Sequence, residues 1–204
     1  VRMTHGGTAA APRAALACDI GPRDHTLFLP PEMRSLQPRG LRWLEALATA
    51  GMVTPGADLS VMPVGDSITA DAYRYEVWAG LTQRGVNVDL TGDSSGPPLV
   101  ETPAVAGKEF DDDHSGHDGA TSVDLVKRLP MSAEDPDVIL LHVGTNDLVW
   151  REESPRILAR DAAALALNLG QAHPASHVFV ARIIPYHRVA GDFLRTLEQG
   201  PNND

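Results

Sequence analysis

Ser67 is the first residue in this sequence whose type and position could support covalent chemistry. It directly follows a short apolar run and precedes a helical pattern. A serine at such a turn can act as a nucleophile, and its backbone N–H lies at or near a helix N-terminus, where a developing oxyanion is stabilised. Gly65 removes a side chain where the chain must turn. The alternative is a structural turn in which Asp66 or Ser67 only caps the helix.

A second candidate follows the apolar run at residues 138–143 and consists of Gly144, Thr145, Asn146 and Asp147. The carboxyl ends of parallel strands meet at one edge of a sheet. Asn146 can therefore share a crevice with Ser67 and offer its side-chain amide to an oxyanion. Asn and Asp are also favoured in turns and caps, which is the structural alternative.

The third candidate is Gly119, within Gly116-His117-Asp118-Gly119-Ala120-Thr121, where a loop meets a helical pattern. A glycine there lets backbone N–H groups approach a ligand closely. Alone this signal is weak, and it gains weight only beside the other two.

The elements that must position these residues begin at about residue 58. Short apolar runs alternate there with helical patterns, a rhythm typical of βαβ units and a parallel sheet covered on both faces. Strands are predicted at 59–64, 86–90, 138–143 and 178–184, and helices at 71–84, 120–129, 155–171 and 189–198. We expect an α/β fold, a three-layer α/β/α sandwich with a parallel, flavodoxin-like sheet.

Residues 1–57 have a different texture and are rich in Ala, Gly, Pro and Arg. Only residues 41–47 resemble a short amphipathic helix. We interpret 1–57 as a poorly structured N-terminal extension outside the catalytic core, and 58–204 as the catalytic domain.

Taken in order, the three candidates resemble the sequence blocks of the SGNH (GDSL-like) hydrolases. Gly65-Asp66-Ser67-Ile68-Thr69 matches the serine block, Gly119 the glycine block and Gly144-Thr145-Asn146-Asp147 the asparagine block. The resemblance implies that Ser67 is the nucleophile and that Gly119 and Asn146 complete the oxyanion hole. Supporting roles fall on the remaining matched residues, which are Gly65, Asp66, Thr69, Gly144, Thr145 and Asp147.

The stretch 110–119, with Phe110, Asp111, His114, His117 and Gly119, is most similar to carbohydrate esterase family 3. That similarity implies hydrolysis of acetyl or other short acyl esters, on a small molecule or a polysaccharide, through a seryl acyl-enzyme. Two alternatives remain open. One is a non-catalytic or truncated carbohydrate-binding relative, and the other is a lipid ester or thioester hydrolase of the same superfamily.

The sequence departs from the family pattern after Ile184, because no D-x-x-H block follows. In the family that block supplies the catalytic Asp and His, and a serine hydroxyl without a base is a poor nucleophile at neutral pH. We therefore expect a C-terminally truncated domain that lacks its last strand and helix. His187, just past the fourth predicted strand, is the candidate base.

The resemblance implies neither a metal nor an organic cofactor. His114 and His117 stand among acidic residues, Asp111, Asp112, Asp113 and Asp118, so a metal site is the alternative reading of this loop. The family resemblance explains the loop without a metal.

The composition of the chain bears on its binding partners, its disulfides and its localisation. A formal net charge of -10 argues against nucleic-acid binding. The single cysteine, Cys18, excludes an internal disulfide, and no apolar run is long enough to cross a membrane. Arg13 interrupts the Ala-rich run where a secretory signal would lie, so no clear signal peptide is expected. Localisation, cytoplasmic or secreted, and oligomeric state stay open.

Overall fold

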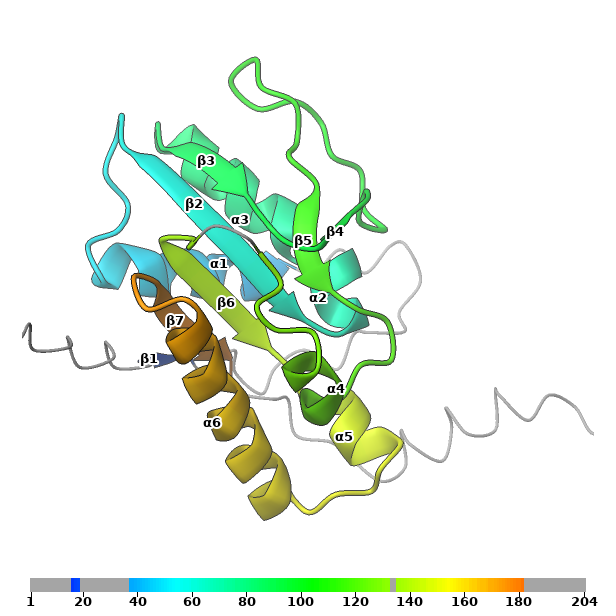
Figure 1. The fold of residues 1–204 in the computed structure, drawn as a ribbon. Helices are drawn as coiled ribbons and strands as arrows, with labels where there is room; N and C mark the ends of the chain where they lie inside the picture. The colour runs from blue at the N-terminus through cyan, green and yellow to red at the C-terminus, as the bar shows by residue number, and fades with distance from the viewer. Residues whose placement is uncertain (1–15, 19–36, 133–134, 182–204) are drawn as a thin grey trace, which may run out of the picture.

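The fold is a three-layer α/β/α sandwich around a mostly parallel sheet (Figure 1). It is seen in a computed structural model that describes residues 16–18, 37–132 and 135–181. The predicted α/β sandwich with a parallel sheet is thereby confirmed.

The sheet is built on β2, which pairs with three other strands. Its order among the described residues is β1-β7-β6-β2-β5-β4, and β3 pairs with the first half of β2. All pairs are parallel except that of β4 with β5. The strands are β1 (Leu16–Cys18), β2 (Asp58–Gly65), β3 (Asn87–Leu90), β4 (Ser94–Ser95), β5 (Asp113–Gly116), β6 (Val138–His142) and β7 (His177–Ala181).

Helices cover both faces of the sheet. In Figure 1, α4, α5 and α6 lie on the near side, and α1 and α3 lie behind it. The helices are α1 (Gln37–Thr49), α2 (Ser67–Asp71), α3 (Arg74–Gln83), α4 (Ser122–Val126), α5 (Thr145–Val149) and α6 (Pro155–Ala172).

The central strands divide the apolar core into two halves. Along β6, Val138 and Leu140 join the cluster beneath α1 and α3, whereas Ile139 and Leu141 join the cluster beneath α4 and α6. Because both faces are buried, the strand is a continuous apolar run from Val138 to Leu141 rather than an alternating one, as the sequence predicted. β6 pairs with β2, and the candidate residues Ser67 and Asn146 follow the carboxyl ends of these two strands.

Part of the predicted N-terminal extension lies inside the core, which corrects the interpretation of residues 1–57. In α1, Trp43 and Leu47 have no exposed surface and pack with the residues of α3. β1 pairs with β7, so β7 is not an edge strand. The sequence signal was weak because α1 has an apolar stripe of few residues and β1 spans only three residues.

Three other predictions need correction or lie outside the described residues. The helix predicted at 71–84 begins only at Arg74 and is α3, and α2, β4, β5 and α5 were not predicted. α2 ends at Asp71 and does not continue into α3, because the side chain of Arg74 donates hydrogen bonds to the carbonyls of Thr69 and Ala70. In a continuous helix these carbonyls would accept hydrogen bonds from backbone N–H groups. The end of the strand predicted at 178–184 and the helix at 189–198 fall outside the described residues.

No helix within residues 37–132 and 135–181 is long and apolar enough to cross a lipid bilayer.

A substitution at Gly65 tests whether the end of β2 tolerates any side chain. A Cβ atom there would lie 2.0 Å from the carbonyl oxygen of His142 and 2.3 Å from Thr69 Oγ1. We expect Gly65→Ala to lower the free energy of unfolding by about 3 kcal/mol, measured by urea denaturation. Gly170→Ala is the matched control, because its Cβ meets nothing closer than 4.0 Å. That helical substitution should raise stability by up to about 1 kcal/mol, and equal effects of the two changes would contradict the steric argument.

Candidate active site

Ser67 lies at the turn between the central strand and the first short helix. β2 ends at Gly65, and Asp66 caps α2 by accepting a hydrogen bond from the N–H of Ile68 at 3.0 Å. Asp66 is fully buried, whereas Ser67 is half-buried. Asp66 is therefore the cap of this helix, and the Ser67 side chain does not act as the cap.

The turn is supported from beneath by Thr69. Its hydroxyl donates to the carbonyl of Val64 at 3.4 Å and lies 3.2 Å from the Tyr73 hydroxyl. Thr69 is completely buried. It therefore holds α2 against the end of β2.

The short strand β5 brings the glycine block to the serine. Its last residue, Gly116, pairs with Gly65, and the N–H of His117 then donates to the carbonyl of Gly65 at 2.9 Å. A Cβ atom on Gly116 would lie 2.5 Å from the backbone nitrogen of Ala70 in α2, so only glycine fits there. Gly119 follows with a φ of +69° and an exposed backbone.

Asn146 joins the same edge from β6, through a turn at Gly144 whose φ is +120°. Its Nδ2 donates to the carbonyl of Ala120 at 2.9 Å, and its Oδ1 accepts from the indole N–H of Trp150 at 3.0 Å. The asparagine amide is thus in direct contact with the residue after Gly119. The structure brings the three blocks to one edge of the sheet, as the sequence predicted.

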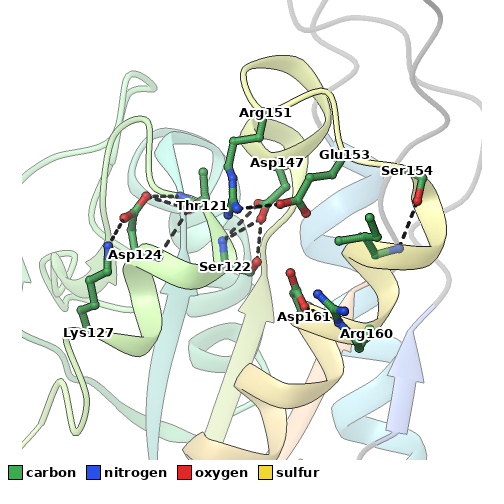
Figure 2. Close-up of polar contacts among 11 residues, drawn as sticks. Thr121, Ser122, Asp124, Lys127, Asp147, Arg151, Glu153, Ser154, Arg160 and Asp161 are labelled. Atoms are coloured by element: carbon green, nitrogen blue, oxygen red, sulfur yellow. Dashed lines mark hydrogen bonds and ion pairs between the residues drawn. The ribbon is translucent and has the colours of Figure 1, made fainter.

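Asp147 ties the asparagine block to the glycine block. Its carboxylate accepts from the N–H of Ser122 at 3.1 Å and from the Ser122 hydroxyl at 2.6 Å (Figure 2). Asp147 is completely buried. Thr121 caps the same helix in a reciprocal capping box with Asp124. Asp147 therefore fixes the start of α4 against α5.

The backbone N–H groups at this edge are either committed, meaning hydrogen-bonded within the chain, or uncommitted, meaning without an acceptor among the described residues. The N–H groups of Ile68, Thr69 and Ala120 are hydrogen-bonded within the chain. Within the described part of the chain, the N–H groups of Ser67 and Gly119 have no acceptor. Two backbone donors are therefore available where the family resemblance implies an oxyanion hole.

The loop histidines serve mainly to hold the glycine block. His114 is buried and its Nδ1 accepts from the N–H of Gly116 at 2.9 Å. Burial first, and then the nearby Arg74 guanidinium, lower the pKa of His114 to about 4, so it is neutral at pH 7. His117 Nε2 lies 3.0 Å from the Asp93 carboxylate. Among residues 16–18, 37–132 and 135–181, no cluster of three His, Cys, Asp or Glu side chains could hold a metal ion.

The general base stays a prediction, as do the catalytic roles of Ser67, Gly119 and Asn146. His187 lies outside the described residues. Among those that are described, no side chain makes a hydrogen bond to the Ser67 hydroxyl. His142 is buried within β6, between Leu141 and Val143.

Two residues of this site escaped the sequence analysis. Trp150 stands four residues after Asn146, the spacing that places two side chains on the same face of a helix. Ser122 follows a capping threonine and could have been recognised as the start of a helix. Neither signal says which side chain it will contact.

A cavity of about 400 Å³ opens beside Gly119. Its walls come from the loop before α4 and from α4 itself with the turn after it, and their side chains are mostly polar or charged. The lining residues are His117, Asp118, Gly119, Ala120, Asp124, Lys127 and Arg128.

Comparison with known families finds a match over most of the chain. The model of the GDSL-like lipase/acylhydrolase family matches residues 64–200, more than half of the chain. No curated protein sequence matches significantly.

Solved structures of esterases share this fold. A Clostridium thermocellum family 3 carbohydrate esterase is 28% identical, with a TM-score of 0.55 over 68% of this chain and 67% of its own. A family 3 carbohydrate esterase from Talaromyces cellulolyticus is 28% identical, with a TM-score of 0.55 over 62% and 63%. A mutant acetyl esterase solved with an acetate ion is 26% identical, with a TM-score of 0.54 over 67% and 69%. The chain thus spans about two thirds of each.

Removal of the Asp147 carboxylate should detach the start of α4. Asp147→Ala leaves the N–H and the hydroxyl of Ser122 buried without an acceptor, so we expect a loss of about 3 kcal/mol in the free energy of unfolding. Asp161→Ala is the control, because it removes only an ion pair with Arg160, whose side chain is 72% exposed. It should leave the urea midpoint unchanged, and a similar loss in both variants would refute the special role of Asp147.

The low pKa of His114 predicts a loss of stability in mild acid. The folded chain holds this imidazole neutral down to about pH 4, whereas the unfolded chain protonates it near pH 6.5. The stabilisation is thus complete above pH 6.5 and declines as the pH falls toward 4. Urea denaturation of the wild type should show a larger drop between pH 7 and pH 5 than that of His114→Asn. Parallel curves for the two proteins would contradict this.

Proposed function

The chain belongs to the GDSL-like lipase/acylhydrolase family, and from this premise we propose that it is a serine esterase that hydrolyses short acyl esters. The family and the similar solved structures support an esterase of this type. The observation that carries the proposal is the set of uncommitted donors at one sheet edge: the N–H groups of Ser67 and Gly119, beside the amide of Asn146.

In the proposed reaction, Ser67 Oγ attacks the ester carbonyl while its proton passes to a general base. The Ser67 N–H, the Gly119 N–H and Asn146 Nδ2 bind the negative charge that develops on the carbonyl oxygen. The bond to the alcohol then breaks and the alcohol leaves with the proton. Water repeats the attack on the acyl-enzyme, which releases the acid and restores the serine. His187 is our candidate for the base.

We propose acetyl esters of carbohydrates as the substrates. Two of the similar structures are carbohydrate esterases and a third is an acetyl esterase. The cavity beside Gly119 supports the same choice, since Asp118, Lys127 and Arg128 offer donors and acceptors to sugar hydroxyl groups rather than an apolar groove for a long acyl chain. Hydrolysis rates of p-nitrophenyl acetate, p-nitrophenyl octanoate and acetylated xylan would separate this proposal from a lipid esterase.

The decisive variant is Ser67→Ala. We expect the purified chain to hydrolyse p-nitrophenyl acetate and Ser67→Ala to lose at least about 10³-fold in kcat, because the nucleophile is removed. An organophosphonate probe, located by mass spectrometry, should label Ser67 in the wild type. Ser95→Ala, at an exposed serine in β4, is the matched control and should retain full activity.

A folded chain that neither turns over the ester nor reacts with the probe would overturn the proposal. The non-catalytic, carbohydrate-binding alternative would then be favoured. Binding of xylan oligosaccharides to the same sample, measured by calorimetry, would test that alternative.

A further inference from the structure

Trp150 is a large aromatic residue that the core does not explain. Its side chain is 46% exposed, whereas Trp43 and Trp78 are 0% and 2% exposed. It ends the short helix α5 at the edge of the sheet that carries the candidate site. Its indole N–H is nevertheless committed, because it donates to Asn146 Oδ1 at 3.0 Å. The one polar atom of this exposed side chain therefore acts on the amide that the proposed function uses.

The two partners of the Asn146 amide require opposite chemistry. The carbonyl of Ala120 can only accept a hydrogen bond, so it needs the NH2 group, whereas the indole N–H of Trp150 can only donate, so it needs the oxygen. A flipped amide would place its oxygen against a carbonyl oxygen and its NH2 group against an N–H group. The pair of partners thus selects one orientation.

In the selected orientation, one N–H group of the Asn146 amide has no acceptor among the described residues. Asn146 Nδ2 carries two hydrogens, and one of them is bound by Ala120. Among the described residues, no acceptor takes the other. Because Ala120 directly follows Gly119, the Asn146 amide that carries this second N–H lies next to the glycine block.

We propose that Trp150 is a positioning residue that holds the Asn146 amide in the orientation needed to bind the oxyanion. The role rests on the proposed esterase function. A donor that is fixed before the substrate arrives needs no reorganisation during the reaction, which is the basis of oxyanion stabilisation by enzymes. Helix α5 supports the arrangement, since the backbone N–H of Trp150 also donates to the carbonyl of Asn146 at 2.9 Å.

A double-mutant cycle tests the proposal. Trp150→Phe keeps an aromatic ring and removes the donor, and we expect it to lower kcat for p-nitrophenyl acetate about 10-fold with little change in KM. Asn146→Ala should lower kcat about 10²-fold or more. In the Asn146→Ala background, Trp150→Phe should have no further effect, because the amide that it positions is gone. Leu167→Ala, at a site of 62% exposure in α6, is the control and should leave kcat unchanged.

Each contrary kinetic result overturns the proposal. An equal loss from Trp150→Phe in both backgrounds would show that the indole acts independently of Asn146. A rise in KM alone would show that the ring contacts the substrate instead. Unchanged kcat in Trp150→Phe would show that the hydrogen bond does not matter for the reaction.

A spectroscopic test decides the same point without turnover. The side-chain amide signals of Asn146, assigned by ¹⁵N NMR, should show slower hydrogen exchange and higher order in the wild type than in Trp150→Phe. Identical Asn146 signals in both proteins would overturn the positioning role. A wild type that has no esterase activity would refute the proposed function instead, and the NMR comparison would still decide the role of Trp150.

Discussion

The candidate site depends on a buried cation that is held by carbonyl groups. The guanidinium of Arg74 donates to the carbonyls of Thr69 and Ala70 in α2 and to those of Gly96 and Asp112 in the long connection after β3. Only 1% of its surface is exposed, and burial lowers its pKa from the ordinary value, yet the planar guanidinium makes five hydrogen bonds to these four carbonyl groups. One side chain therefore joins the helix that begins at Ser67 to the connection that leads to β5 and Gly119.

The two buried carboxylates at this edge of the sheet accept hydrogen bonds from the first turns of two short helices. Other backbone N–H groups at the same edge remain without an acceptor among the described residues. Asp66 accepts a hydrogen bond from the N–H of Ile68, and Asp147 accepts hydrogen bonds from the N–H and the hydroxyl of Ser122. Each fixes the first turn of a short helix, where backbone N–H groups point outward and would otherwise compete for the same ligand. The N–H of Ser67 lies next to that of Ile68, which is hydrogen-bonded to Asp66. Gly119 lies three residues before Ser122, whose N–H is hydrogen-bonded to Asp147. The polar network thus determines which donors remain for an oxyanion.

The sequence predicted those parts of the fold that local pattern can encode. The run from Val138 to Val143 is apolar at every position except His142, which identifies a strand buried on both faces, and β6 lies there with its two core clusters. β5 could not be predicted in the same way, because Asp113–Gly116 is short and polar. It becomes a strand through pairing with the end of β2, a contact between residues that are distant in sequence. The three blocks were recognised by their residue types, but their contacts through Asp147 and Trp150 depend on the folded chain.

In the proposed esterase, the groups that would bind the oxyanion and the group that would transfer the proton are physically separable. The donor half is built from the ends of β2, β5 and β6, and its geometry is set by hydrogen bonds within residues 65–150. Removal of the triad from a serine hydrolase leaves a residual acceleration of about 10³–10⁴ over water, which comes from the oxyanion hole and substrate binding. Stabilisation of the tetrahedral intermediate by these donors therefore does not require that the base come from the same segment. In the proposed reaction, the base would decide how fast Ser67 attacks, whereas Asn146 and Gly119 would decide how well the negative charge on the carbonyl oxygen is stabilised.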